Sequence, residues 1–189
     1  GELSSTTSLA RQIEREAGHN QRQSIRLAFF IDWDVSFFML PVLEELRRIH
    51  PLLTVELESR SIPEMAAALV SPKFDLSLCF HHLVAKEQED KLCSQYLTSI
   101  RRQLYCSSSH PLAYKKNLTL SDFRLEDCIA LFTERHPEPC RTIRQICALR
   151  GFEPQLHLMP NHDSVIMAVE AGMGYCILDE WSRNRHNAN

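Results

Sequence analysis

The sequence predicts an α/β fold built on a parallel sheet. Short, almost continuously apolar segments alternate with segments of helical periodicity, in the order strand, helix, strand, helix, strand over residues 24–80. Hydrophobic residues make up 44% of the 189 residues, which is typical of a globular domain with a sizeable core. No apolar run approaches the ~20 residues of a membrane-spanning helix, so we expect no membrane contact.

The first strand and helix carry the clearest patterns. Residues 24–31 (SIRLAFFI) are nearly all apolar, as in a buried parallel strand. Residues 34–49 repeat apolar side chains at helical spacing. Phe37 and Leu40 lie off the main apolar stripe of that helix. A second apolar face is typical of a helix that a further partner covers, such as another subunit.

A second strand, a helix and a third strand follow. Residues 52–58 (LLTVELE) predict the second strand, and residues 74–80 (FDLSLCF) the third. Ser61 and Glu64 have the spacing of a capping box, in which each side chain can bond the other residue's backbone N–H group. The helix that they open should end before Pro72.

The pattern changes after residue 91. Residues 92–107 form a long strand-like segment that could pass from one lobe into another. Further strands are expected at 128–132, 155–159 and 174–178, with helices at 139–150 and 162–171. Thr119 and Asp122 form a second capping-box pattern. The polar residues 1–23, with Leu9, Ile13 and Ala17 at four-residue spacing, are interpreted as a linker or the tail of a helix.

Charge and cysteine content exclude several functions. The formal net charge is −3 and the basic residues are scattered, whereas nucleic-acid-binding domains usually carry a basic face. This chain is therefore not expected to contact DNA directly. Seven cysteines without a CxxC spacing argue against a complete disulfide framework and against a zinc ribbon. They favour a reducing, cytoplasmic location.

Enzyme signatures are missing from the sequence. It has no GxSxG, HExxH, GxxxxGK[ST] or GxGxxG motif, and only five glycines. We expect no catalytic residues and no cofactor. His81 and His82 are adjacent on a strand end and should point to opposite faces, so no metal site is expected either.

Four strings in the chain resemble the effector-binding domain of LysR-type transcriptional regulators. They are HPLLTVELESRS at residues 50–61, FDLSLCF at 74–80, SSSHPLA at 107–113 and VEAGMGYCILDE at 169–180. The resemblance implies a type II periplasmic-binding-protein-like fold with two lobes joined by two crossover strands. Lobe one would comprise residues 24–98 plus 163–189, and lobe two residues 99–162. The crossovers would lie near residues 98–101 and 159–162.

The resemblance also implies partners. A small-molecule effector would bind in the cleft between the lobes. DNA would be contacted through an N-terminal winged helix-turn-helix domain that this sequence lacks. The domain would assemble as a homodimer or homotetramer, with Phe37 and Leu40 of the first helix facing Ile143 and Arg144 of the opposing subunit.

Candidate effector residues follow from where ligands bind in open α/β sheets, beyond the carboxyl ends of strands and at helix N-termini. Ser99 and His162 are added because they lie at the expected crossovers. The full set is Asp32, Trp33, Asp34, Ser36, Ser61, Phe80, Ser99, Thr133 and His162.

Alternatives stay open at several of these residues. Asp32 and Asp34 could cap the first helix, or they could select a cationic or hydroxyl-rich ligand. Trp33 could stack on a ligand or pack between lobes. Ser61 could serve as a helix cap and as a ligand contact at once.

The leading hypothesis is an effector-sensing regulatory domain, in which a bound metabolite biases the lobes and so the distant DNA-binding domains. A free-standing solute-binding protein of the same fold is the first alternative. An enzyme on a similar two-lobed scaffold, such as a prephenate-dehydratase-like protein, is the second.

Overall fold

The structure is a computed structural model that describes residues 7–15, 24–81, 84, 91–132 and 137–182. Its contacts divide the chain into two compact units, residues 1–99 and residues 100–189. Each unit contains one sheet of its own, of three strands in the first unit and four in the second.

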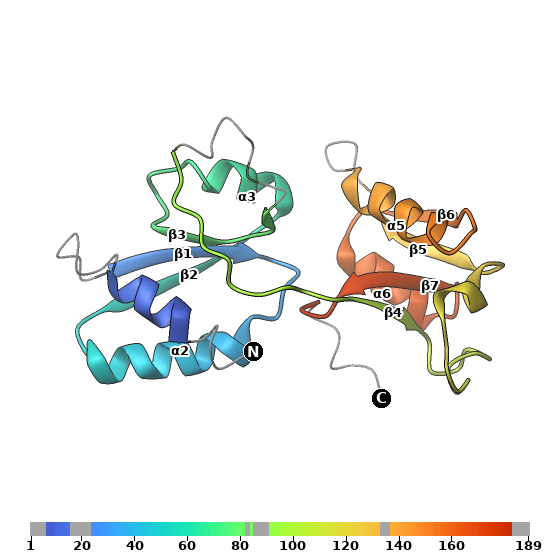
Figure 1. The fold of residues 1–189 in the computed structure, drawn as a ribbon, viewed down its shortest axis with the longest axis horizontal. Coiled ribbons are helices and arrows are strands. Elements are labelled where there is room, and N and C mark those ends of the chain that lie inside the picture. Colours follow the sequence, from blue (N-terminus) through green and yellow to red (C-terminus); the bar gives the residue numbers. More distant parts are fainter. Residues whose placement is uncertain (1–6, 16–23, 82–83, 85–90, 133–136, 183–189) are drawn as a thin grey trace. The chain divides into compact units, whose positions relative to one another are not determined.

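The sheet of the first unit is wholly parallel. Its strands are β1 (Ser24–Phe30), β2 (Thr54–Arg60) and β3 (Leu76–Leu78), in the order β2-β1-β3 (Figure 1). β1 pairs with both neighbours in parallel register. The carboxyl ends of all three strands therefore meet at one edge, as the strand and helix order predicted.

Two helices connect these strands. α2 (Ser36–Ile49) runs through Pro41 and buries the apolar stripe that the sequence predicted, namely Phe38, Met39, Val42 and Leu46. α3 (Ile62–Ala68) begins at the predicted capping box of Ser61 and Glu64. Because each helix follows a strand, both begin at the carboxyl edge of the sheet.

A further helix spans residues 7–15 and belongs to the first unit. Leu9, Ala10 and Ile13 are buried, with Ile13 fully so. Residues 1–23 were interpreted as a linker or the tail of a helix, and the described part, residues 7–15, is a packed helix. The four-residue spacing of Leu9 and Ile13 already marked the face that is buried.

The sheet of the second unit is mixed. Its strands are β4 (Arg102–Cys106), β5 (Asp127–Leu131), β6 (Gln155–Met159) and β7 (Tyr175–Asp179), in the order β4-β7-β5-β6. β4 pairs with β7 in antiparallel fashion, and β5 is parallel to both β6 and β7. The long strand expected over residues 92–107 is shorter, because only 102–106 find a partner strand.

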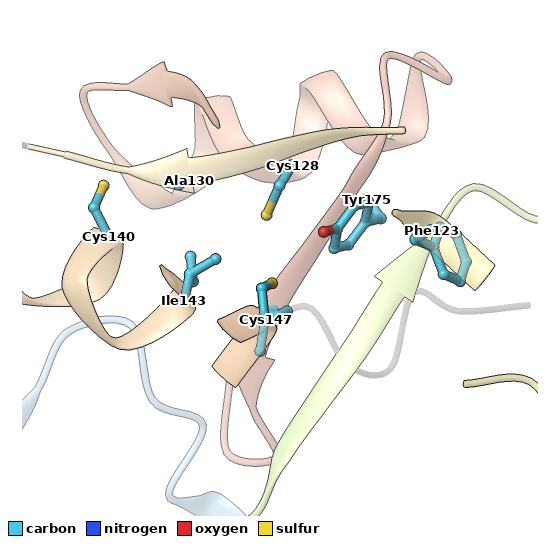
Figure 2. Close-up of a cluster of buried hydrophobic side chains, with 8 residues drawn as sticks. Phe123, Cys128, Ala130, Cys140, Ile143, Cys147 and Tyr175 are labelled. Atoms are coloured by element: carbon cyan, nitrogen blue, oxygen red, sulfur yellow. The ribbon is translucent and has the colours of Figure 1, made fainter. Parts of the chain in front are cut away.

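Helices α5 (Glu138–Ala148) and α6 (His162–Glu170) cover opposite faces of β5. Side chains alternate along that strand. Cys128 and Ala130 join the core cluster that contains the α5 residues Cys140, Ile143 and Cys147 (Figure 2). Ile129 joins a second cluster that contains the apolar face of α6. A short 3-10 helix, η2 (Leu120–Phe123), opens with the predicted capping box.

The lobe assignment from the sequence is corrected at one point. Residues 163–189 were assigned to lobe one, with a second crossover near residues 159–162. Instead, α6 packs on β5, and β7 is bonded to β4 and β5, so the chain through residue 182 stays in the second unit. The strand pattern of residues 174–178 was correct, but periodicity does not specify which sheet a strand joins.

Candidate functional site

The candidate site in the first unit lies at the carboxyl edge of its sheet. Two loops meet there, because the backbone N–H of Ile31 donates to the carbonyl of Arg60 at 2.9 Å. The loop after β1 carries Trp33 and Asp34, and Ser61 directly follows Arg60. Residues that are 29 positions apart in the sequence are thus neighbours at this edge.

Three aromatic rings pack together behind these loops. The ring centroids of Trp33 and Phe80 lie 4.9 Å apart, and those of Trp33 and Phe30 lie 4.8 Å apart, both edge to face. Phe30 and Phe80 complete the cluster at 5.4 Å. Trp33 is 4% exposed. Its indole therefore packs inside the first unit and leaves little ring surface for a ligand, an outcome that neither sequence alternative specified.

The start of α2 is held by a carboxylate. Asp34 Oδ1 accepts the backbone N–H of Ser36 at 3.0 Å and the Ser36 hydroxyl at 2.5 Å. One of the otherwise unpaired N–H groups at the helix start is thereby satisfied. The N-cap of α2 is Val35, which makes no side-chain capping bond, so Asp34 supports the helix start from one position before the cap. Ser36 is exposed, and its hydroxyl proton is donated to the carboxylate.

The start of α3 repeats this chemistry. Glu64 Oε2 accepts the Ser61 hydroxyl at 2.6 Å and the Ser61 backbone N–H at 2.8 Å. The hydroxyl bond, followed by the backbone bond, lowers the pKa of the Glu64 carboxyl from its ordinary value. Both serine hydroxyls at this edge thus donate to carboxylates. The Ser61 oxygen also accepts the backbone N–H of Glu64 in the capping box, and each hydroxyl oxygen keeps a lone pair that can accept.

Of the other predicted site residues, Asp32 shares this edge, half-buried in the turn after β1. Ser99 and His162 lie elsewhere. Ser99 is exposed at the end of the first unit, where its hydroxyl lies 2.8 Å from that of Tyr96. His162 is buried in the second unit at the start of α6. Thr133 lies outside the described residues.

Sequence reasoning missed two contacts of these residues. His162 Nε2 lies 3.2 Å from the hydroxyl of Ser182, which is itself 4% exposed. No pattern in the sequence linked these two residues, which are 20 positions apart. Phe30 as the third ring behind Trp33 and Phe80 could have been anticipated, because it is the last residue of a strand that neighbours the strand before Phe80.

The predicted interface residues differ in their exposure to solvent. Leu40 is 58% exposed on α2, and Phe37 is half-buried with its ring 5.1 Å from that of Phe38. Arg144 is exposed and forms an ion pair with Glu153. Ile143 is 3% exposed and belongs to the core between α5 and β5, so its assignment to an interface was wrong. The stripe that it shares with Cys140 and Cys147 faces inward.

Two further searches concern metals and membranes. In the described part of the chain, no three His, Cys, Asp or Glu side chains lie together as a metal-binding group. None of the described helices has the length and apolar character to cross a membrane.

Comparison with solved structures supports the fold. The PA01 protein of Pseudomonas aeruginosa, assigned to the LysR family of transcriptional regulators, gives a TM-score of 0.64 at 20% identity, over 91% of this chain and 62% of that one. HinK, a LysR family transcriptional regulator from the same organism, gives 0.65 at 21%, over 85% and 54%. The effector binding domain of QuiR, in complex with shikimate, gives 0.67 at 17%, over 88% and 77%.

The TM-scores show a shared fold, and the type II periplasmic-binding-protein-like fold class is thereby confirmed. The chain spans only 62% and 54% of the first two regulators. Comparison with curated proteins gives no match. Residues 18–189, however, match the sequence profile of the LysR substrate binding domain. Because that match covers nearly all of the sequence, the chain belongs to the LysR substrate binding domain family.

Proposed function

We propose that this chain is the effector-sensing part of a LysR-type transcription regulator. It binds a small metabolite at the carboxyl edge of the first sheet and passes the event to a DNA-binding domain elsewhere in the full protein. The profile match over residues 18–189 carries this proposal. It favours a regulator over a free-standing solute-binding protein and over an enzyme.

The hydrogen-bonding chemistry of the edge supports a ligand that donates hydrogen bonds. Ser36 and Ser61 each commit their hydroxyl proton to a carboxylate, Asp34 and Glu64 respectively. What remains for a ligand is a set of acceptor lone pairs beside negative charge. Hydroxyl or ammonium groups fit this set, and it disfavours an unsubstituted anion. This is the hydroxyl-rich or cationic alternative left open by the sequence.

Shikimate is a suitable first probe, because QuiR binds it and because it carries several hydroxyl groups. A panel would compare shikimate with other polyols, amines and simple carboxylates in thermal unfolding. A ligand held only by the folded protein raises the unfolding midpoint by an amount set by its concentration and affinity. We expect at least one hydroxylated or cationic member of the panel to give a saturable rise.

The chain offers a matched control for the site. Ser61→Ala removes a capping hydroxyl at the proposed site, whereas Thr119→Ala removes the equivalent hydroxyl of the capping box at η2 in the second unit. Each variant should lower the midpoint without ligand, since a lost cap costs about 1 kcal/mol. Only Ser61→Ala should also weaken the ligand response. If the ligand raised the unfolding midpoint equally in Ser61→Ala and Thr119→Ala, or if no compound raised it in the unchanged chain, the proposed site would be contradicted.

Assembly and location belong to the same proposal. Leu40 and the partly exposed ring of Phe37 give α2 an apolar outer surface, which supports a homodimer or a higher homo-oligomer through this helix. The exposed Arg144 of α5 remains a candidate for the opposing surface. All seven cysteines are free thiols, which supports a location in the reducing cytoplasm.

A further inference from the structure

The helix of residues 7–15 lies outside the matched family domain, which begins at residue 18. It nevertheless buries its apolar face in the first unit, where Leu9, Ala10 and Ile13 are 5%, 6% and 0% exposed. Arg11 and Arg15 on its other face are exposed. In Figure 1 this dark-blue helix lies on the same side of the sheet as α2. The first unit thus provides a surface that accepts an amphipathic helix.

Burial of apolar side chains holds this helix on the first unit. Leu9 and Ile13 are 5% and 0% exposed. Release of the helix would expose both side chains to water, which is unfavourable.

Two side-chain contacts tie the helix to different parts of the unit. Near its end, Glu14 Oε1 lies 3.1 Å from Nε2 of His50, the residue that caps the carboxyl end of α2. Near its start, the Ser8 hydroxyl accepts a hydrogen bond from the side-chain amide of Gln95 at 2.7 Å. Gln95 lies in the extended segment of residues 91–99, which leads to the boundary with the second unit.

We propose that the helix of residues 7–15, called the latch below, couples α2 to the segment connecting the two units. A change in the path of residues 91–99 would displace Ser8 through its bond to Gln95, and a shift of α2 would displace Glu14 through its contact with His50. Because α2 begins at the candidate effector edge, the latch gives that edge a physical route to the residues that precede the domain. This last step rests on the proposed function, whereas the docking itself does not.

Amide hydrogen exchange of the ligand-free chain tests the latch. Exchange in residues 9–15 should be at least tenfold slower than in an unstructured peptide of the same sequence. Ile13→Asp should abolish that protection. In the same variant, backbone ¹⁵N relaxation should show larger motion of residues 92–99, a segment without regular secondary structure. Arg11→Asp is the matched control, because it introduces the same residue on the exposed face and should leave the motion of residues 92–99 unchanged.

A gentler pair of variants covers the case in which Ile13→Asp unfolds the unit. Ser8→Ala and Gln95→Ala each remove one partner of the same hydrogen bond. Singly and together they should increase the motion of residues 92–99 to a similar extent, because a bond can be broken only once. Exchange of residues 9–15 at the peptide rate in the unchanged chain would overturn docking. Unaltered ¹⁵N relaxation of residues 92–99 in these variants would overturn the coupling. Neither result depends on any effector.

Discussion

Nδ1 of His110 accepts a hydrogen bond from the backbone N–H of Leu112 at 3.2 Å. The imidazole also packs on Phe123, with centroids 5.4 Å apart, and Phe123 packs on Tyr175 at 5.0 Å. The histidine of the SSSHPLA string therefore has a structural role. It closes the turn after β4 and fastens that turn to the core of the second unit.

Replacing His110 should destabilise the second unit. His110→Ala removes a ring that is 9% exposed together with the acceptor for Leu112, so we expect a loss of about 2 kcal/mol. His157→Ala is the control, since its side chain is 53% exposed. It should change stability by less than about 0.5 kcal/mol. Urea unfolding followed by tyrosine and tryptophan fluorescence compares the two. Similar losses would argue against the role of His110.

Acid should weaken the start of α3 in a defined direction. The pKa of Glu64 is lowered from its ordinary 4.5 by the hydroxyl and then the backbone of Ser61. The stability that this carboxylate contributes is complete above about pH 4.5 and is lost as the pH falls through the lowered pKa. In Glu64→Gln, the unfolding midpoint should therefore decline less steeply with acid than in the unchanged chain. A parallel decline in both proteins would be evidence against this.

The same logic applies to η2 in the second unit. Bonds from the Lys115 ammonium, then from the Thr119 backbone, lower the pKa of Asp122. Asp122→Asn should likewise flatten the acid dependence, this time of the second unit. Circular dichroism against pH measures the acid unfolding of the whole chain. A fluorescent label placed in one unit at a time then separates the two effects. Steeper acid unfolding in this variant would reverse the expected sign.

Thiol reactivity should separate the cysteines by burial. Desolvation raises the pKa of Cys128 and of Cys176 to about 12, so both stay protonated at neutral pH and react poorly. Cys93 is exposed. We expect iodoacetamide to modify Cys93 first in the folded chain and to reach Cys128 and Cys176 only on unfolding. Peptide mass spectrometry over a labelling time course reads this out, with Cys93→Ser as control. Early labelling of Cys128 would contradict the packing.

Removing the Tyr175 hydroxyl should not cost stability. This oxygen is buried without a hydrogen-bond partner of normal geometry and points toward the thiols of Cys128 and Cys147, which are weak partners (Figure 2). A buried polar group that lacks a good partner is expensive. Tyr175→Phe keeps the ring against Phe123 and should leave the unfolding free energy equal or raise it by up to about 1 kcal/mol. A loss above about 1 kcal/mol would mean that the thiols bond it well.

Self-association through α2 can be tested at Leu40. Leu40→Glu places a charge on the proposed apolar surface and should weaken a dimer about tenfold or more, as loss of a central interface contact does. Leu52→Glu is the control, because Leu52 is 83% exposed in the turn between α2 and β2. Sedimentation across a concentration series compares the variants. Equal weakening by both, or by neither, would exclude α2 as the interface.

Local patterns predicted most of the elements. Both capping boxes are where the sequence placed them, and β6 has the predicted bounds. These features depend on neighbours within a few positions, so they are visible in one sequence. Sheet membership was not visible, since the pairing of β7 with β4 depends on contacts about 70 residues apart. The burial of Ile143 was missed because the dimer assignment rested on family resemblance and not on the stripe that it shares with Cys147.

For the candidate site, the sequence could predict position but not side-chain direction. Trp33 and Ser61 follow parallel strands, which share their carboxyl edge, so they were expected to lie near one another. The sequence could not show that Trp33 would turn inward onto Phe30 and Phe80, since a loop side chain has no periodicity to reveal its direction. The pairing of His162 with Ser182 was hidden because it joins the start of α6 to a residue 20 positions away, beyond any local pattern.

Each described strand pairs only within its own half of the chain, residues 1–99 or 100–189. A nascent chain can therefore finish the first sheet while the second is still being translated, since no strand of the later half is needed to close it. Separately expressed halves should on this basis each acquire their own sheet.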